Sequence, residues 1–560
     1  MAASVRYDVA AEGICWGPTW KKTPEGEWLL PEYSLGLGVI EWCETNLCQP
    51  DGPDTGDPWR FTDEQLRLIM WIYAVDENGR FLFNEIVIQR MKGWGKDPFG
   101  AAICAVELLG PARFSHWDPE TGEPVGKPHP SPWIQTAAVS KEQTQNTFLL
   151  FPNLFSKQLQ ELYGMEIGKE KMYAVARGPV HAVTSSARAL EGGRTTLLLA
   201  NETHHWLANN GGVEMDRVGK RNLAKSRDGQ ARLIKITNAP LPGEDSVAEK
   251  DWYAYTQHVE GRLKNYRVLY DSLEAPADTK LDDPDSLRRG ISVARGDSVW
   301  VNVDRIMEAV WDINTPPQVA RRFYLNQIVA AEDAFVVPQD WDALANYDRI
   351  VPDGEEIVAF FDGSKSDDST GIVGKCLSDG HEFVIAVWEH PSNPDLERWE
   401  VPRHEVDAAV ARMFDRFKVH AFYCDLWGWE SYIDKWMDEH GSKVTVYAVA
   451  GEGKTSHPFA WDMRARIPEF TQAAVRFVAD VESGAFTHDG HPILRRHVHN
   501  ARRAPNRWGV SLAKEHRESP NKIDLAVCAV GAGKAWRDVR AVLAAKKVKE
   551  KSAGRAYSFS

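Results

Sequence analysis

The sequence has no long apolar run, few cysteines and no excess of positive charge. None of its apolar runs approaches the ~18 residues of a membrane-spanning helix, and its first residues lack the basic and apolar regions of a secretory signal. Its 7 cysteines are scattered, and Cys43 and Cys48 form one close pair without a second. This pattern predicts neither a disulfide framework nor a zinc ribbon and is typical of a reducing compartment. The net charge of −14 leaves any contact with nucleic acid to local basic patches.

The sequence does have the length and composition of a globular protein with more than one domain. It contains 560 residues, of which 43% are hydrophobic and 26% are charged. Predicted strands and helices alternate in the first half, which indicates a parallel sheet with helices on both faces. We expect an N-terminal arm at residues 1–58, a first α/β domain at 59–335, a linker at 336–354, a second domain at 355–545 and a basic, disordered tail at 546–560.

A strand, a glycine-containing turn and a helix follow one another around residue 93. Residues 86–88 predict a buried strand, the turn KGWGK occupies residues 92–96, and an alanine-rich helical segment follows. Such a turn binds phosphate through backbone N–H groups at a helix N-terminus, with Lys96 reaching the β- and γ-phosphates. The strict pattern GxxxxGK[ST] is not met, because Arg90 stands at the first glycine position and Asp97 at the hydroxyl position. The alternative is an ordinary strand–turn–helix with a solvated lysine.

Two further polar residues fit the same kind of site. The apolar run TTLLLA at residues 195–200 predicts a buried parallel strand that is followed by Asn201 and Glu202. Because α/β sheets bind ligands at the carboxyl ends of central strands, Glu202 is placed to polarise a water that attacks a γ-phosphate. Its alternative role is to cap the next helix. Gln65 lies on a helix that Thr62 caps, and its amide suits an adenine edge as well as a plain helix surface.

Three carboxylates in the second half share one pattern. Asp362 and Asp425 each follow an apolar strand, and Asp524 opens an alanine-rich helix. Converging carboxylates bind hard divalent cations, and two such ions about 3.5–4 Å apart activate a water and stabilise the leaving oxygen in phosphodiester cleavage. Each aspartate alone is more readily a cap or turn residue, and a turn-forming role is also expected for Asp368. The strand–strand–strand–helix–strand order around them favours a metal-dependent nuclease.

A basic region precedes Asp524. An arginine cluster beside a metal site suits a phosphate backbone, and the alternative is a solvated helix face. The histidines of the same region have no cysteine partners and no fitting spacing, which disfavours a zinc site. The arginines are Arg495, Arg496, Arg502, Arg503 and Arg507, and the histidines are His488, His491, His497 and His499.

Together these motifs resemble a known family, the large terminase subunit of tailed bacteriophages. The resemblance runs from about Trp59 to Ala535 and depends on the order and spacing of several loose motifs. In the first half these are Gln65, the turn ending in Gly95-Lys96, LLLANE, Thr237-Asn238-Ala239 and RRFYLNQ; in the second half they are FFDGSKSDDSTGIVG, FYCDLWGWE and NKIDLAVCAV.

The resemblance implies an α/β N-terminal ATPase of the additional-strand (ASCE) P-loop type, with Walker A and Walker B motifs, and a C-terminal nuclease with an RNase H-like fold. It implies Glu202 as the catalytic carboxylate of the ATPase, and Thr237 and Asn238 as residues that couple hydrolysis to DNA movement. The nuclease metals would be held by Asp362, Asp425 and Asp524. The implied ATP-binding residues are Gln65, Arg90, Lys92, Gly93, Gly95, Lys96 and Asp97.

Two positions depart from the family pattern. Asp97 stands where the family has Ser or Thr, and Asn201 stands where Asp precedes Glu. Both positions would lie near one Mg²⁺, and our hypothesis is that Asp97 supplies the carboxylate that Asn201 lacks. A rise in ATPase activity in the Asp97→Ser variant would contradict it. The alternative is a weakened or lost ATPase.

The expected function is ATP-driven movement of double-stranded DNA into procapsids, with endonucleolytic cutting of concatemeric DNA. The expected cofactors are ATP and Mg²⁺ or Mn²⁺, with two ions at the nuclease site. The expected partners are double-stranded DNA, the portal protein, the small terminase subunit and further copies of the chain in a ring of five. The protein is expected in the host cytoplasm, and neither in the mature virion nor in a membrane. One alternative is an RNase H-like nuclease or recombinase with a non-hydrolysing N-terminal domain. Another is a non-catalytic assembly protein that docks on a portal.

Overall fold

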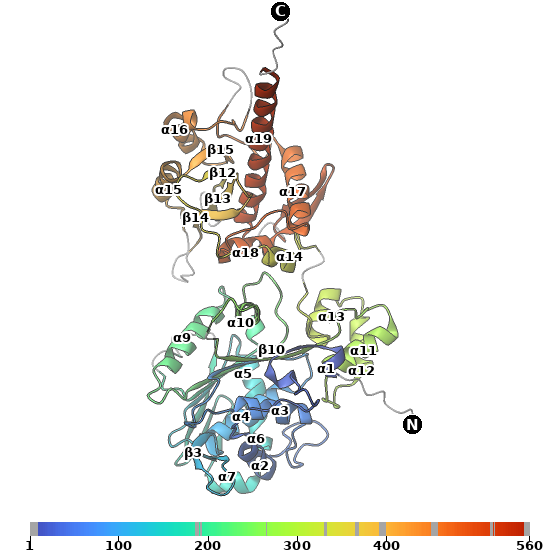
Figure 1. Cartoon of the computed structure of the whole chain (residues 1–560). Coiled ribbons are helices and arrows are strands. Elements are labelled where there is room, and N and C mark those ends of the chain that lie inside the picture. The colour runs from blue at the N-terminus through green and yellow to red at the C-terminus, as the bar shows by residue number, and fades with distance from the viewer. Residues whose placement is uncertain are drawn as a thin grey trace, which may run out of the picture. The chain divides into compact units, whose positions relative to one another are not determined.

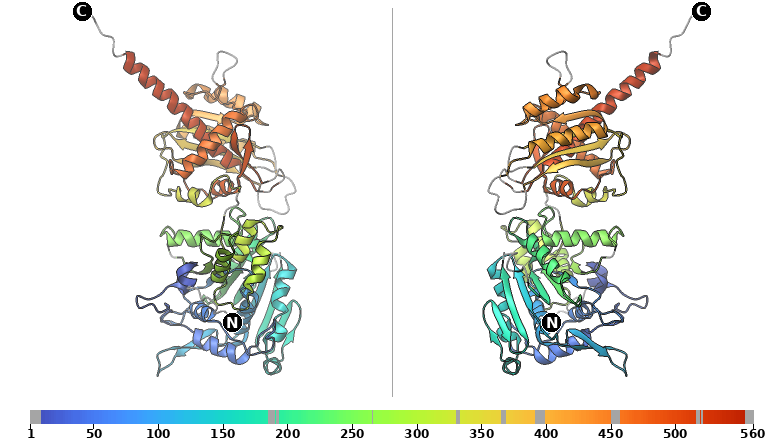
Figure 2. Two further views of the ribbon diagram at one scale, coloured as in Figure 1. Left: turned by 90° about the vertical axis from the view of Figure 1, so that its right-hand side faces the viewer. Right: turned by 90° about the vertical axis from the view of Figure 1, so that its left-hand side faces the viewer.

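The computed structural model describes residues 9–184, 190, 193–264, 266–329, 333–364, 369–390, 399–449, 457–515, 519 and 521–553. The chain divides into two compact units, Met1–Val329 and Ala330–Ser560. Each unit is built from a sheet that helices cover (Figures 1 and 2). None of the described helices is both long and apolar enough to span a lipid bilayer.

The described residues of the first unit form a nine-stranded sheet in the order β1-β11-β2-β10-β9-β5-β8-β7-β6. Neighbouring strands from β11 to β8 are parallel, and the pairs at the two edges are antiparallel. The strands are β1 (Ile14–Trp16), β2 (Glu85–Gln89), β5 (Ile134–Ala138), β6 (Glu166–Ile167), β7 (Lys171–Ala174), β8 (Gly178–Thr184), β9 (Leu197–Asn201), β10 (Arg232–Thr237) and β11 (Val268–Glu274).

Helices and short turns complete the first unit, together with the hairpin of β3 (Arg113–Trp117) and β4 (Pro124–Lys127). They are α1 (Val9–Glu12), η1 (Pro18–Trp20), α2 (Gly36–Asn46), α3 (Asp63–Ile72), α4 (Lys96–Leu109), α5 (Lys141–Phe148), α6 (Phe151–Leu154), α7 (Lys157–Leu162), η2 (Thr203–His205), α9 (Gly212–Ala224), α10 (Val247–Val259), α11 (Pro284–Ala294), α12 (Val303–Val310) and α13 (Pro317–Tyr324).

The central strands are apolar on both faces because each face packs against helices. In β9, Leu197 and Leu199 belong to the core that also contains α2, α3 and α4. The alternate residues Leu198 and Ala200 belong to the core that contains Val213 and neighbouring residues of α9. The strand therefore has a continuous apolar sequence without a polar side, as TTLLLA predicted.

The order of strands brings three strand ends to one edge of the sheet. β10 lies between β2 and β9, and its residues Ile236 and Thr237 pair with Asn201 and Gln89 respectively. The turn after β2 and the residues after β9 and β10 therefore start from the same edge. A strand inserted between the cradle strand and the acidic strand is the additional-strand arrangement, so the predicted fold of this unit is confirmed.

Several local predictions for the first unit differ from the structure. The arm at 1–58 is part of the unit, because β1 pairs with β11 and Val39 and Cys43 are buried in the main core. Strand β11 was not predicted from the sequence, and the loop expected at 111–132 contains the hairpin β3–β4. Residues 141–162 form three short helices, α5, α6 and α7, and Pro152 lies in the first turn of α6, where a missing N–H costs nothing.

The described residues of the second unit form a four-stranded sheet in the order β14-β13-β12-β15. Strands β12, β13 and β14 are an antiparallel meander, and β15 returns after a helix to lie parallel to β12. This is the RNase H-like order that was predicted. The strands are β12 (Glu356–Asp362), β13 (Thr370–Cys376), β14 (Glu382–Trp388) and β15 (Lys418–Cys424), with a separate hairpin of β16 (Arg502–Asn506) and β17 (Gly509–Ala513).

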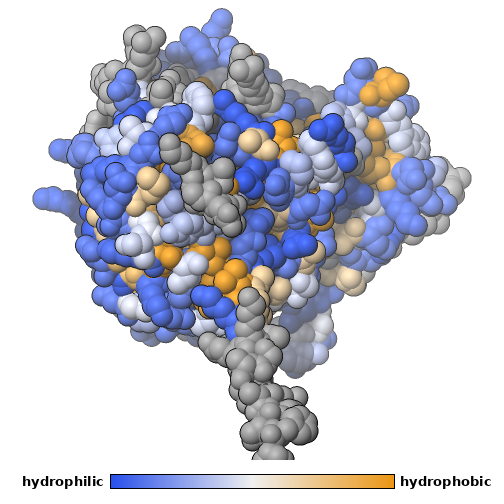
Figure 3. Space-filling model, turned by 90° about the horizontal axis from the view of Figure 1, so that it is seen from above, coloured by the Kyte–Doolittle hydropathy of each residue, from blue (hydrophilic) through white to orange (hydrophobic). Residues whose placement is uncertain are grey.

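Helices cover both faces of this second sheet. Consecutive residues of β12 belong to different cores. Val358 and Phe360 pack with α17 and α19, and Ala359 and Phe361 pack with α15 and α16. On the face seen in Figure 3, hydrophobic residues lie in small groups among hydrophilic ones. The helices are α14 (Pro338–Ala343), α15 (Arg403–Arg416), α16 (Glu430–His440), η3 (Gly441–Lys443), α17 (Ile467–Glu482), α18 (Pro492–Asn500) and α19 (Asp524–Ala553).

The structure also corrects predictions for the second unit. Residues 336–354 are not a linker, because Val336 and Trp341 are buried in the core of the unit. No strand is described at 444–449, where Val449 makes an isolated bridge with His457. Helix α19 continues to Ala553, past the predicted start of a disordered tail at 546, because no glycine or proline interrupts residues 534–553. Figure 2 shows this helix as a long rod. The rest of that tail, and Asp368, lie outside the described residues.

Candidate functional site

The turn between β2 and α4 has the geometry of an anion cradle. Gly93 (φ 91°) and Gly95 (φ 94°) both have left-handed backbones, and Gly95 is the N-cap of α4. A Cβ atom at Gly95 would also lie 3.2 Å from the Trp300 ring. Both the left-handed backbone and this close approach therefore favour glycine at position 95. The first N–H groups of α4 are therefore exposed to the space above the turn, where the helix end favours an anion.

Lys96 begins α4 and bends back over the turn. Its Nζ donates to the carbonyl oxygens of Arg90 (3.3 Å) and Met91 (3.1 Å). Burial lowers the pKa of Lys96, and the negative charges of Glu202 and Asp97 oppose that shift. The ammonium group is thus held between the turn and the acidic strand end, where a phosphate would offer it better partners than two carbonyls.

A cavity of about 810 Å³ opens above the turn. It is lined by most of the residues predicted to bind ATP, by Phe323 of the RRFYLNQ motif and by Trp300, which no sequence signal indicated. Residues near the predicted arm also line it, namely Gln49, Asp51, Gly52, Pro53, Asp54, Trp59 and Arg60. The predicted residues among its lining are Gln65, Lys92, Gly93, Gly95, Lys96, Asp97, Glu202 and Asn238. The volume is within the range of small-molecule sites.

Arg90 does not line this cavity, so its predicted contact with ATP is wrong for the side chain. The guanidinium is fully buried, with Nε 2.9 Å from Glu64 Oε1 and a second ion pair to Asp271. Trp94 Nε1 donates to the same Glu64 oxygen at 3.1 Å. Arg90 therefore supports the turn from behind, through contacts that only the tertiary structure creates.

Gln65 reaches the cavity but is also a capping residue. Its Oε1 accepts a hydrogen bond from Thr62 N at 3.3 Å, and Thr62 Oγ1 accepts one from Gln65 N at 3.3 Å, which completes a capping box at the start of α3. The amide oxygen is thus engaged with the backbone. The predicted contact of Gln65 with an adenine edge stays a prediction.

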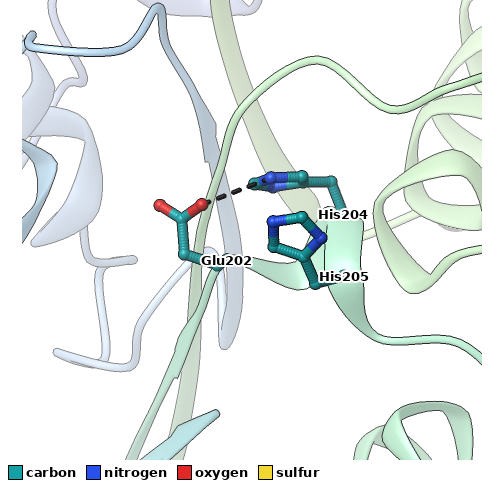
Figure 4. Close-up of side chains that lie close together, drawn as sticks. All are labelled: Glu202, His204 and His205. Atoms are coloured by element: carbon teal, nitrogen blue, oxygen red, sulfur yellow. Dashed lines mark ion pairs between the residues drawn. The ribbon is translucent and has the colours of Figure 1, made fainter. Parts of the chain in front are cut away.

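Glu202 projects into the cavity from a left-handed residue. It follows β9 with φ 55° and is the N-cap of η2, and its Oε2 lies 3.3 Å from Nε2 of the buried His204 (Figure 4). A non-glycine residue in this conformation is strained, and such strain concentrates at functional sites. The histidines directly after Glu202 were visible in the sequence NETHH but were not considered.

Asn201 does not share the position of Glu202. It is fully buried and is absent from the residues that line the cavity; its Nδ2 donates to Thr147 Oγ1 at 2.7 Å. The structure therefore does not support the predicted contact of Asn201 with a metal ion at the cavity. Consecutive residues of a strand point to opposite faces of the sheet, and the Asn201 side chain points away from the cavity. Asp97 does line the cavity, so it can act there without Asn201.

Thr237 and Asn238 connect the acidic strand end with the turn. Thr237 Oγ1 accepts a hydrogen bond from His204 N at 3.1 Å, and Asn238 Nδ2 donates to the Arg90 carbonyl at 2.7 Å. That carbonyl also accepts from Lys96. These hydrogen bonds join the turn to the residues beside Glu202, and the coupling role of Thr237 and Asn238 stays a prediction.

Asp97 gives a prediction on pH. Burial and the negative charge of Glu202 raise the pKa of Asp97 from 3.8 to about 6. Since the folded state then holds its proton more tightly than the unfolded state, the stability of the first unit falls as pH rises from about 4 to about 6, by up to about 3 kcal/mol. We expect Asp97→Asn to raise the thermal unfolding midpoint above pH 6.5 and to leave it unchanged below pH 4.

Thermal unfolding at several pH values, with Asp282→Asn as a control, measures this effect. Asp282 is exposed and lies outside the cavity lining. An equal gain for Asp97→Asn at both ends of the pH range would show that its charge is not the cause.

The second unit brings two of the predicted carboxylates to neighbouring strand ends. Asp362 ends β12, and Asp425 follows β15, whose last residue Cys424 pairs with Phe361. The Asp425 N–H donates to the Phe361 carbonyl at 3.0 Å, and Asp425 Oδ1 accepts from Met463 N at 3.0 Å. Burial raises the pKa of Asp425, as expected for a carboxyl group held away from water.

Asp524 reaches the same end of the sheet from α19. Asp362 pairs with Gly371 of β13, where an added Cβ would lie 2.3 Å from the side chain of Leu525. Cys528 Sγ in the same part of α19 lies 3.4 Å from the Gly371 carbonyl oxygen, and burial, followed by the negative charges of Asp362 and Asp524, raises the pKa of its thiol. The three predicted aspartates therefore surround one edge of the sheet.

These aspartates form a wide group rather than a tight one. In the part of the chain that the structure describes, the set of three potential ligand residues with atoms all within 4.8 Å is Glu202, His204 and His205, not the aspartates. The expectation of two nuclease cations therefore stays a prediction.

A hydrogen-bond chain beside Asp524 was missed in the sequence. His497 Nδ1 accepts from Leu525 N at 3.0 Å, and its Nε2 lies 2.9 Å from Glu389 Oε1. Burial opposes ionisation of Glu389, but hydrogen bonds from His497 and Arg496 lower its pKa to about 2. The chain fixes the first turn of α19, which carries Asp524. No spacing signal links residues this far apart in sequence.

The predicted DNA-binding arginines are divided between two roles. Arg495 makes a bidentate pair with Asp342 (2.8 and 2.7 Å), and Arg496 pairs with Glu389. Arg502 is buried and donates to backbone carbonyls. The prediction that these three side chains are free to bind DNA phosphates is therefore wrong. Arg503 and Arg507 are exposed on or beside the β16–β17 hairpin, as a phosphate-binding residue must be.

The histidines of this region do not gather into a zinc site. His488 Nε2 lies 2.9 Å from the Trp341 carbonyl, and His499 Nε2 lies 3.2 Å from Asp342 Oδ1. His497 contacts Glu389 instead. These three rings thus have separate partners, and the argument against zinc at the four histidines stays a prediction.

Comparisons with known proteins add two groups of relatives. No protein-family model matches the chain. It is 40% identical over 573 residues to the Gene 13 protein of Mycobacterium phage L5, covering 93% of this chain and 94% of that protein. It is 39% identical over 579 residues to the Gene 13 protein of Mycobacterium phage D29, with the same coverage. Among solved structures it is similar to the large terminase of bacteriophage HK97, with a TM-score of 0.48 and 18% identity over 90% of this chain and 100% of that one.

Proposed function

Because this chain belongs to the same family as the Gene 13 proteins of Mycobacterium phages L5 and D29, and carries a phosphate cradle and a carboxylate edge in one polypeptide, we propose that it is the large terminase subunit of a tailed bacteriophage. In this proposal it hydrolyses ATP to move double-stranded DNA into a procapsid and cuts concatemeric DNA. The observation that carries the proposal is that Lys96 and Glu202 line the same cavity. The strands that precede them, β2 and β9, lie on either side of the additional strand β10.

In the ATPase, the backbone N–H groups of α4 and the Lys96 ammonium bind the β- and γ-phosphates. Lys92 is exposed at the cavity and adds a second positive charge. Glu202 accepts a proton from, or orients, the water that attacks the γ-phosphate. The carboxylate oxygens of Asp97 fit Mg²⁺, which would neutralise the phosphate charge when bound. Thr237 and Asn238 relay movements of the turn to Glu202.

In the nuclease, Asp362, Asp425 and Asp524 would hold divalent cations. Carboxylate oxygens are the ligands that Mg²⁺ and Mn²⁺ prefer, and such ions supply an activated water and stabilise the leaving oxygen. His497 fixes the helix start that presents Asp524. The exposed Arg503 and Arg507 are placed to contact the DNA phosphates, because their side chains are not used in buried ion pairs.

The proposal includes partners and a place of action that rest on the resemblance alone. These are the portal protein, the small terminase subunit and further copies of the chain in a ring of five on the portal. The action takes place in the host cytoplasm during assembly, and the protein is absent from the mature virion.

A second candidate function is an RNase H-like nuclease or recombinase whose first unit binds no nucleotide. The observation that favours it is the deviant turn, in which Arg90 is committed to Glu64 and Asp271 and an aspartate replaces the usual hydroxyl residue. Under this alternative, cutting would require metal alone.

Duplex DNA should stimulate ATP hydrolysis by the purified full-length chain. A motor that moves DNA turns over faster when its track is present, so we expect at least a several-fold increase with linear double-stranded DNA. The measurement is phosphate release with and without DNA, at fixed Mg²⁺ and low salt. ATP binding without stimulation would argue against a motor, and no ATP binding at all would favour the nuclease-only function.

A further inference from the structure

Glu202, His204 and His205 lie together on one short turn. The left-handed Glu202 is followed by η2, which directs the three side chains to one side (Figure 4). His204 Nε2 is 3.3 Å from Glu202 Oε2, and the centroids of the two imidazole rings are 4.0 Å apart. One potential ligand atom from each residue lies within 4.8 Å of the other two.

The buried ring in this cluster lacks a hydrogen bond on the side that faces Glu202. His204 has no exposed surface, and among the described residues its Nε2 makes no hydrogen bond, although Glu202 Oε2 lies 3.3 Å away at ion-pair distance. The nitrogen and the carboxylate oxygen are thus close but not joined by a hydrogen bond. A cation bound to both atoms would satisfy them.

The separation of His204 Nε2 and Glu202 Oε2 agrees with tetrahedral coordination of a metal ion. Two ligand atoms bound to Zn²⁺ at about 2.0–2.1 Å and at the tetrahedral angle lie about 3.3–3.4 Å apart. The separation of His204 Nε2 and Glu202 Oε2 is 3.3 Å. His205 is exposed and can turn toward them. Two histidines and one glutamate, with a fourth position open, form a ligand set that is known for zinc, and imidazole disfavours Mg²⁺.

The surroundings keep both rings in the state that binds a metal. Burial, aided by His205, lowers the pKa of His204 well below its ordinary value, and partial burial also lowers that of His205, so both are neutral at pH 7. Ligation through Nε2 of His204 places its proton on Nδ1, where Thr237 Oγ1 lies 3.1 Å away and can accept it. The 3.3 Å contact of Asn238 N with the same Nδ1 would then be lost.

We propose that Glu202, His204 and His205 form a binding site for a transition-metal cation of the Zn²⁺ class, separate from the magnesium sites of the ATPase and nuclease. The binding itself does not depend on the proposed function. Its consequence does: because Glu202 would be both a metal ligand and the residue that activates water, an occupied site would block ATP hydrolysis. Zinc would therefore act as an inhibitor of the motor.

Co²⁺ is the probe for the first test, because four-coordinate Co²⁺ absorbs visible light far more strongly than six-coordinate Co²⁺. The full-length chain would carry Asp362→Asn and Asp425→Asn, which remove two of the three candidate nuclease ligands, and nucleotide would be absent. We expect a strong visible band that saturates at one Co²⁺ per chain and disappears on adding Zn²⁺. His205→Ala should weaken Co²⁺ binding at least tenfold, and His204→Ala should abolish the band.

His116→Ala is the matched control, because this histidine is exposed on β3 and does not line the cavity. Since His205 is also exposed, its substitution leaves the fold intact and keeps the test valid if His204→Ala does not fold. Absence of the band, or an unchanged band in His205→Ala, would overturn the proposal. If the wild type hydrolyses ATP, Zn²⁺ inhibition should weaken at least tenfold in His205→Ala. If it does not hydrolyse ATP, the proposed function fails while the Co²⁺ titration still decides the metal site.

Discussion

ATP hydrolysis should fall by at least about a hundredfold in both Lys96→Ala and Glu202→Gln. The two substitutions should act differently. Lys96→Ala removes the ammonium that lies over the turn and so weakens nucleotide binding. Glu202→Gln keeps the size of the side chain but removes the group that activates water, so nucleotide binding should persist while kcat falls.

Steady-state phosphate release and binding of a fluorescent ATP analogue separate the two effects. Lys225→Ala and Glu214→Gln are the matched controls, since Lys225 is exposed next to α9, Glu214 is only partly buried on α9, and neither lines the cavity. Full activity in Glu202→Gln would remove this residue from the mechanism. If Lys96→Ala bound and hydrolysed ATP normally, the turn between β2 and α4 would not be the phosphate site.

Cutting of plasmid DNA should be lost in Asp362→Asn and in Asp425→Asn, again by at least about a hundredfold, while ATP hydrolysis continues. The reason is that each change removes a negative ligand oxygen from the edge where β12 and β15 end side by side. An amide keeps the shape of the side chain but binds a hard cation more weakly. The substitutions should therefore separate the two activities in one chain.

Conversion of supercoiled plasmid to open and linear forms in Mg²⁺ and in Mn²⁺ measures this effect. Asp438→Asn on α16 is the control, because that aspartate is exposed and far along the chain from the strand ends. Partial recovery of the variants at high Mn²⁺ would be expected for metal ligands. Cutting that persists at the wild-type rate in both variants would contradict the two-cation nuclease site.

Much of the architecture was predictable because it depends on local patterns. The strand at 197–201 ends a continuous apolar run, and only burial on both faces stabilises such a run in a folded unit. The order of strands and helices around Asp362 and Asp425 favoured a metal-dependent nuclease, and the family resemblance implied the RNase H-like sheet. The glycine-containing turn at 92–96 predicted the anion cradle, whose Gly93 and Gly95 have left-handed backbones.

Predictions failed where a residue's role depends on distant partners. Arg90 looked like a cradle residue because it precedes the turn, but its charge is neutralised by Glu64 and Asp271, which lie 26 and 181 residues away in the sequence. Arg495 and Arg496 likewise looked like a basic patch in the sequence, but their charges are paired with Asp342 and Glu389, which lie far away in the chain. Strand β11 was missed because the polar residues Asp271 and Ser272 interrupt its apolar pattern, yet both are fully buried in the structure.

The amino-acid sequence by itself therefore determined the elements, their order and the positions of the chemical groups at their ends, since these follow from hydrophobic periodicity and turn chemistry. Only the tertiary structure decided which charged groups face a cavity and which are neutralised in ion pairs. It placed Trp300 over the turn, turned Asn201 away from Glu202 and brought His204 to within 3.3 Å of that carboxylate. The contacts of Trp300 and Asn201 depend on packing between segments far apart in the chain, and the His204 contact depends on the left-handed backbone of Glu202, so a short-range sequence pattern indicates none of them.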